Sequence, residues 1–133
     1  MDPRLAAAIA RGSLIRRKMA RAEGGAVSSA DAARLLGVSE KTVLNRWRHH
    51  RLVGWKKRTQ VFFPVWQFRD GQPLPGVEEI LGIFSSDDHW RIMGYFLLNR
   101  LSLGEQRPLD LLREGKVALV IQHAKAYGKE DLW

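Results

Sequence analysis

The sequence predicts a mainly helical protein: an N-terminal helix-turn-helix with a small β-hairpin wing, followed by a small helical domain. Apolar residues recur at helical spacing over most of the 133 residues, and one β-prone stretch occupies residues 52–68. A turn-rich segment at residues 69–76 then separates two parts of opposite net charge. We therefore expect one domain at residues 1–70 and a second at residues 71–133.

The first 25 residues predict a basic helix. Leu5, Ile9, Ile15 and Met19 recur at helical spacing among arginines over residues 4–21. We expect a break in this helix near Gly12, because glycine weakens a helix interior. Two consecutive glycines at residues 24–25 mark its end.

The next stretch predicts two helices joined by a tight turn. Residues 28–31 form a capping box that begins a short helix, and Gly37 ends it in the usual position. A second helix is expected over residues 40–50, with Val43 and Trp47 on its apolar side. Beyond it, the β-prone runs 52–55 and 61–63 flank a basic tip, which predicts the hairpin wing.

The second part predicts helices and a loop. Pro108 stands at a first-turn position that proline tolerates, and Gly115 closes the same helix. The expected elements are helices at 77–84, from the cap at 85–88 to about 98, at 108–114 and at 116–127, with a loop at 99–106.

Charge and composition limit the functions that the chain can have. Residues 1–76 carry 15 Lys and Arg against 5 Asp and Glu, whereas residues 77–133 carry 7 against 9. A basic half suits a polyanion such as nucleic acid, because neutralised phosphates release counterions. The absence of cysteine excludes disulfides and thiolate metal sites. No apolar run is long enough for a signal peptide or a membrane span, so we expect a cytoplasmic protein without a membrane partner.

The helix pair and the hairpin predict binding to double-stranded DNA. In a helix-turn-helix the second helix enters the major groove, where Asn can pair with adenine and Arg with guanine. Cations on a hairpin tip suit phosphate or minor-groove contact. The candidate DNA-binding residues are Lys41, Thr42, Asn45, Arg46 and Arg48 on the helix, and Lys56, Lys57 and Arg58 on the hairpin.

Two other interpretations of this basic half stay open. One is a solvated charged face on a helical domain that never touches DNA. The other is RNA binding, which is weaker because the aromatic residues of this part resemble core positions rather than stacking platforms.

Catalysis and metal binding have no support in the sequence. His49 and His50 are neighbours on a predicted helix, so their side chains diverge, and His89 and His123 each stand alone. There is no nucleophile elbow and no phosphate-binding glycine loop. We expect a protein that is not an enzyme and that needs no cofactor or metal.

The second part nevertheless carries a specific series of motifs. It contains Trp90 in a helix, Asn99 in a loop that ends at Leu103-Gly104, the segment Pro108-Leu109-Asp110-Leu111-Leu112, then Gly115 and a last helix. With the upstream element Pro64-Val65-Trp66-Gln67-Phe68, this order resembles antitoxins of the Xre/MbcA/ParS type over about residues 24–128.

The resemblance implies a type II antitoxin. Its partner would be a RES-domain toxin that degrades NAD, which the C-terminal domain covers while the basic half represses the shared operon. The candidate toxin-binding residues are Asn99, Arg100, Arg107, Arg113, His123, Lys125, Tyr127 and Trp133.

A second function fits the same residues. The chain would then be a stand-alone helix-turn-helix transcriptional regulator of phage or plasmid origin, whose second half only dimerises it. In either case we expect a homodimer, or a hetero-oligomer with the toxin, because such proteins commonly bind two half-sites.

Overall fold

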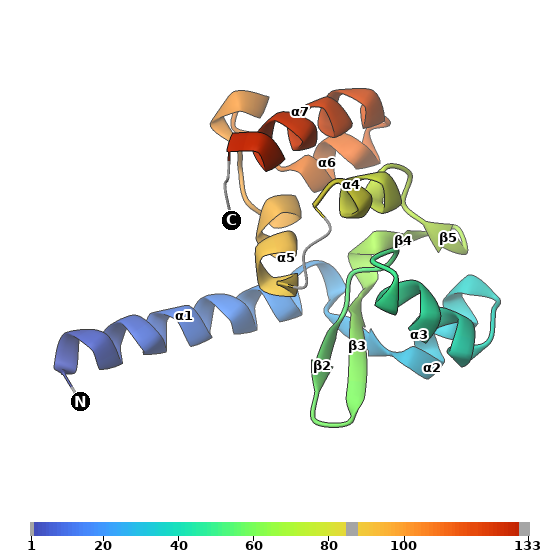
Figure 1. The fold of residues 1–133 in the computed structure, drawn as a ribbon, viewed down its shortest axis with the longest axis horizontal. Helices are drawn as coiled ribbons and strands as arrows, with labels where there is room; N and C mark the ends of the chain where they lie inside the picture. Colours follow the sequence, from blue (N-terminus) through green and yellow to red (C-terminus); the bar gives the residue numbers. More distant parts are fainter. Residues whose placement is uncertain (1, 85–87, 131–133) are drawn as a thin grey trace.

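The computed structural model describes residues 2–84 and 88–130. Over these residues the protein is mainly helical, with a small sheet (Figure 1). The helices are α1 (Pro3–Arg21), α2 (Ser29–Leu36), α3 (Glu40–Arg48), α4 (Val77–Phe84), α5 (His89–Leu97), α6 (Pro108–Arg113) and α7 (Val117–Glu130). The strands are β1 (Ala26–Ser28), β2 (Trp55–Lys57), β3 (Gln60–Pro64), β4 (Phe68–Arg69) and β5 (Gln72–Pro73).

Helix α1 is a single unbroken helix, so the expected break near Gly12 is wrong. Asp2 caps its first turn, where the carboxylate accepts a hydrogen bond from the backbone N–H of Arg4 at 2.8 Å. One glycine costs a helix only about 1 kcal/mol, which the flanking helix formers offset. The helix projects from the body of the molecule (Figure 1), and Met19 and Ala20 at its C-terminal end pack against the core.

The predicted pair of short helices is present as α2 and α3. The hydroxyl of Ser28 accepts a hydrogen bond from the N–H of Asp31 at 3.2 Å, and Gly37 ends α2 with a φ of 67°. The other half of the expected capping box differs, because the Asp31 carboxylate pairs with Arg34 at 3.0 Å. Helix α3 ends at Arg48, two residues earlier than expected.

The predicted hairpin is present, and the sequence missed a third strand. Strands β2 and β3 pair antiparallel with Lys57 opposite Gln60, and β1 pairs with the other edge of β3. The first strand of the hairpin starts at Trp55 rather than Leu52. A side chain at Gly54 would lie 2.9 Å from the ring of Phe63, so the chain there passes too close to β3 for any larger residue.

The predicted connector at residues 69–76 contains a second hairpin. Strands β4 and β5 pair through Arg69 and Gln72, and the turn residues Asp70 and Gly71 both have positive φ. Positive φ at both central positions is the geometry that Asp-Gly favours in a two-residue hairpin loop.

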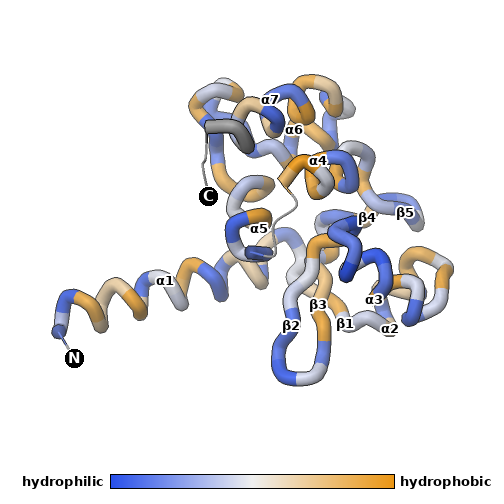
Figure 2. The backbone as a smooth tube through the Cα atoms, in the orientation of Figure 1, coloured by the Kyte–Doolittle hydropathy of each residue, from blue (hydrophilic) through white to orange (hydrophobic). Residues whose placement is uncertain are grey.

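Two apolar clusters hold the protein together. The smaller one lies beneath α2 and α3 and includes Ala32, Val43 and Phe63. The larger one joins Trp66 and Leu74 to the buried faces of α4–α7. Figure 2 shows this division, with apolar β3 and α4 inside and hydrophilic α3 and β2 at the surface. One core therefore connects the base of the hairpin to the C-terminal helices.

A buried polar side chain fastens the chain before the hairpin to the chain after it. Gln67 is fully buried, and its amide bonds both the N–H and the carbonyl of Val53, at 2.8 and 2.7 Å, and the carbonyl of Pro64 at 3.1 Å. Because every one of these groups lies away from water, the glutamine satisfies backbone atoms that would otherwise cost stability. This contact gives the Pro64–Phe68 element a structural purpose.

The C-terminal helices follow the prediction closely. The expected loop at residues 99–106 contains a short 3-10 turn at Leu101–Leu103, and Arg100 and Gln106 form an isolated antiparallel bridge. Among the described residues, no helix has both the length and the apolar character to cross a lipid bilayer.

Candidate nucleic-acid interface

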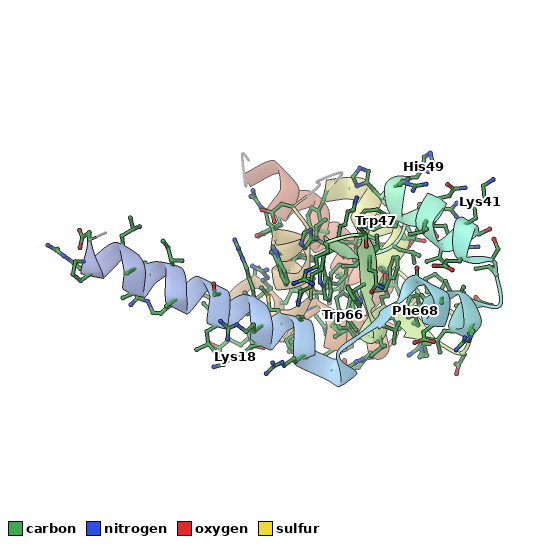
Figure 3. The ribbon with its side chains drawn as sticks, turned by 90° about the horizontal axis from the view of Figure 1, so that it is seen from below. Lys18, Lys41, Trp47, His49, Trp66 and Phe68 are labelled. Atoms are coloured by element: carbon green, nitrogen blue, oxygen red, sulfur yellow. The ribbon has the colours of Figure 1, made fainter. Side chains whose placement is uncertain are left out.

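The inner face of α3 is fixed to the rest of the molecule. Val43 is fully buried, and the indole N–H of Trp47 donates to the carbonyl of Gly54 at 3.0 Å, at the base of the hairpin. Figure 3 shows Lys41 and His49 at the outer edge of α3, whereas Trp47 lies on the side toward the body. The side chains on the outer face are therefore presented on a braced helix.

The outer face of α3 brings several predicted residues together. Thr42, Asn45 and Arg46 line one surface hollow of about 490 Å³, together with His49 and Arg51. The Thr42 hydroxyl lies 2.9 Å from the hydroxyl of Ser39, the residue that caps α3. A hollow edged by an amide and two guanidinium groups suits the edges of bases and their phosphates.

Two predicted residues of α3 lie outside this hollow. Lys41 is exposed in the first turn of the helix. Arg48 lines a separate pocket of about 360 Å³ that also includes His50 and His89. The structure therefore groups three of the five predicted α3 residues and places Arg48 toward the C-terminal helices.

The hairpin presents its cations at the surface. Lys56, Lys57 and Arg58 are all exposed, and Arg58 turns the chain with a φ of 58°. The chain continues into Gln60, which pairs with Lys57 across the two strands. Figure 1 shows the hairpin extending away from the core, beside the α2–α3 pair.

The cations of α3 and the hairpin differ from neighbouring arginines in their ion pairing. Within the described residues, Lys41, Arg46, Arg48, Lys56, Lys57 and Arg58 make no ion pair, whereas nearby Arg34 and Arg51 pair with Asp31 and Glu78. Their charge is therefore available to an external anion.

The predicted toxin-binding arginines are engaged inside the molecule. Arg107 bonds both carboxylate oxygens of Asp110, at 2.8 and 2.7 Å, and Arg107 and Arg113 reach Glu23 at 2.9 and 3.1 Å. These hydrogen bonds lower the pKa of Glu23 and of Asp110, and the bond to Asp110 raises the pKa of Arg107. The cluster ties the turn that follows α1 to α6.

An aromatic cluster engages three more of these residues. The guanidinium of Arg100 lies over the rings of Tyr95 and Tyr127, at 5.1 and 4.9 Å, and donates to the carbonyl of Gly94 at 3.0 Å. The ring nitrogens of His123 lie 2.8 Å from the hydroxyl of Tyr95 and 2.7 Å from that of Ser102. Burial raises the pKa of Tyr95.

The remaining predicted toxin contacts differ in their placement. Asn99 and Lys125 are exposed, while Trp133 lies outside the described residues. Large apolar side chains flank Asn99, because Leu98 and Leu101 are 52% and 82% exposed. Within the described part of the chain, no group of three His, Asp or Glu side chains is placed to hold a metal ion.

Sequence reasoning missed one part of this surface. Arg16 and Arg17 of α1 lie beside Lys56 and Lys57 of β2, and all four line one groove. The signal was the run Arg16-Arg17-Lys18, but nothing in the sequence brings that helix to the hairpin.

Comparison with known proteins supports the fold. No protein-family model matches the chain, and no curated protein matches it. The chain is similar to a solved structure, the NMR structure of Rv2175c, with a TM-score of 0.66 and 23% sequence identity. The similarity covers 80% of this chain and 83% of that one, so the two share an arrangement of helices and strands.

Proposed function

We propose that the protein is a sequence-specific transcriptional regulator that binds double-stranded DNA. Helix α3 enters the major groove as the recognition helix of a helix-turn-helix, and the β2–β3 hairpin acts as a wing on the adjacent backbone. The observation that carries this proposal is the outer face of α3, which presents Asn45 and Arg46 from a helix whose inner face is buried.

The packing beneath α3 supports this role. Ala32 and Ala33 of α2 are both buried, and their small side chains allow α2 and α3 to approach closely across the turn at Gly37. A recognition helix must hold its side chains in a fixed register against the bases, which a braced helix does and a mobile one does not.

The experiment compares a base contact with a phosphate contact. We would select preferred duplexes from a random pool and measure the affinity of two variants for them. Asn45→Ala should lower the discrimination between the preferred and the other bases at one position of the site, by about 1–3 kcal/mol of binding free energy. Lys57→Ala should weaken all sequences alike and lower the slope of log K against log salt by about 1.

Lys125→Ala serves as the control, because this cation is exposed on α7, away from the proposed interface. If Asn45→Ala and Lys57→Ala both weakened binding uniformly, the assignment of α3 as the recognition helix would be wrong. If the wild-type protein showed no preference among duplexes, sequence-specific regulation would be excluded.

Toxin neutralisation is a second candidate function. The observation that favours it is the pair of exposed leucines, Leu98 and Leu101, beside Asn99, since exposed apolar side chains suit a protein partner. Affinity purification of the tagged chain from its host tests this function. A stoichiometric partner that depletes NAD only after it is released would support an antitoxin, and a pure homo-oligomer would contradict it.

A further inference from the structure

A groove between α1 and the hairpin gathers positive charge. Its volume is about 460 Å³, with Arg16 and Arg17 of α1 on one side and Lys56 and Lys57 of β2 on the other. The aromatic rings of Trp55 and Trp90 also line it. Two elements that are distant in sequence therefore present four cations to the same space.

The lining of this groove is basic and aromatic in the described part of the chain. None of its lining residues is Asp or Glu, and α1 contains six Lys and Arg and no acid. The guanidinium of Arg16 lies 5.9 Å from the ring centroid of Trp90. Burial lowers the pKa of His89 at the end of the groove, Asp88 partly opposes this effect by raising it, and Arg16 lowers it by a smaller amount. The positive charge of the groove comes from its four cations, Arg16, Arg17, Lys56 and Lys57, and this charge suits an anion.

Most of helix α1 lies outside the core, against which Met19 and Ala20 at its C-terminal end pack. None of its residues is buried, and Leu5, Ile9, Leu14 and Ile15 are each at least half exposed. Leu5, Ile9 and Ile15 lie within about 120° of one another around the helix axis, but Leu14 lies opposite Leu5, and Arg16 projects between Leu5 and Ile9. Insertion into a membrane surface requires a continuous apolar face, which the charge of Arg16 interrupts, so this distribution favours a soluble polyanion.

The position of α1 relative to the hairpin completes the argument. Figure 1 shows the β2–β3 hairpin between α1 on one side and the α2–α3 pair on the other. A duplex that contacts α3 and then the hairpin would next meet α1. The hairpin cations Lys56 and Lys57 border both the proposed wing surface and this groove.

We propose that α1 is a second DNA-binding element. Phosphates of the DNA strand that passes the α1 side of the hairpin bind in the groove between α1 and β2. This inference rests on the proposed function. Because 19 residues of helix span about 28 Å, α1 can extend the contacted duplex by up to about eight base pairs.

The test uses the full chain with the double variant Arg16→Gln/Arg17→Gln, which retains residues of good helix propensity. Its control, Lys116→Gln/Lys125→Gln, loses the same net charge from exposed positions of the C-terminal half. Each lost phosphate contact should lower affinity about fivefold at 0.15 M salt and reduce the salt slope by about 0.9, with base preference unchanged. The single variant Arg17→Gln is measured as well, because it removes one cation of the groove and leaves the contact between Arg16 and Trp90 in place.

Duplex length provides the second arm of the experiment. Removing base pairs from the hairpin flank of the site should weaken the wild-type protein and have little further effect on the double variant. If the variant matched its control on long duplexes while Asn45→Ala still altered base preference, the role of α1 would be overturned and the proposed function would stand.

Two further outcomes separate the remaining explanations. If neither the wild-type protein nor the variants bound duplex DNA in preference to heparin, the proposed function itself would fail. If the variant lost binding to vesicles of anionic lipid but kept full DNA affinity, α1 would bind membranes and the inference would be wrong.

Discussion

Two regions of this protein are rich in positive charge, but they use it differently. On α3 and the hairpin, the cations make no ion pair within the described residues. Around α6, Arg107 and Arg113 share the carboxylates of Glu23 and Asp110. The same residue types therefore present unpaired charge in one region and fasten the turn after α1 to α6 in the other.

The neighbours of a cation decide whether its charge is available to a binding partner. Glu23 lies 84 residues before Arg107 in the chain, in a turn with a φ of 55°, and the fold brings its carboxylate to 2.9 Å. An arginine bonded in this way must break internal contacts before it can bind a partner, which costs free energy. An unpaired arginine has no such cost beyond desolvation.

The largest expected effect comes from breaking the internal cluster. Arg107→Ala should lower the free energy of unfolding by about 2 kcal/mol, because it removes the charge-assisted hydrogen bonds that Arg107 makes to Asp110 and Glu23. Thermal or urea unfolding followed by circular dichroism measures this change. DNA affinity of the folded variant should equal that of the wild-type protein.

Lys116→Ala is the matched control, since Lys116 pairs with Glu114 at 3.3 Å but both side chains are about half exposed. It should change stability by less than about 0.5 kcal/mol. Equal losses of unfolding free energy in Arg107→Ala and Lys116→Ala would show that the Arg107 cluster contributes no more than a surface ion pair.

The opposite behaviour is expected for the outer face of α3. Arg46→Ala should reduce affinity for the selected duplex about tenfold, which corresponds to about 1.4 kcal/mol, and leave the unfolding free energy within about 0.5 kcal/mol. Fluorescence anisotropy with a labelled duplex measures the affinity. If Arg46→Ala lowered the stability and left DNA affinity unchanged, Arg46 would stabilise the fold as the arginines around α6 do, and would not bind DNA.

Much of the fold could be predicted from the sequence, because its signals are local. The cap at Ser28, the left-handed Gly37 and the first-turn Pro108 each mark a helix end through contacts within a few residues. Strand β1 could not be predicted in this way. It spans three residues, too few to show alternation, and exists because β3 offers it an edge.

The candidate site was predictable only in part, for a related reason. Helical periodicity places Asn45 and Arg46 on the outer face, since Val43 and Trp47 define the inner one. The groove at Arg16 was not predictable, because it depends on a long-range placement of α1 beside β2.

A smaller effect should appear when pH is lowered. The pKa of Glu23 and of Asp110 lies below its ordinary value in the folded protein, so their contribution to stability is present above the ordinary carboxyl pKa. It is lost as pH falls through the lowered values, from about pH 5 downward. The stability difference between the wild-type protein and Arg107→Ala should therefore shrink between about pH 7 and pH 3. A difference that stayed constant would mean that Arg107 stabilises the fold through packing alone.

The smallest effect is expected at Lys125, the exposed cation of the C-terminal half. Lys125→Ala removes a charge that has no ion partner within residues 2–84 and 88–130, so stability and DNA affinity should each change by less than about 0.5 kcal/mol. The same substitution tests whether an unpaired cation far from α3 binds a partner. A loss of toxin co-purification with unchanged stability would give the C-terminal half a partner-binding surface of its own. A tenfold loss of DNA affinity would instead mean that α7 contacts the duplex. The contrast between the cations of α3 and the hairpin and those of the C-terminal half would then be wrong.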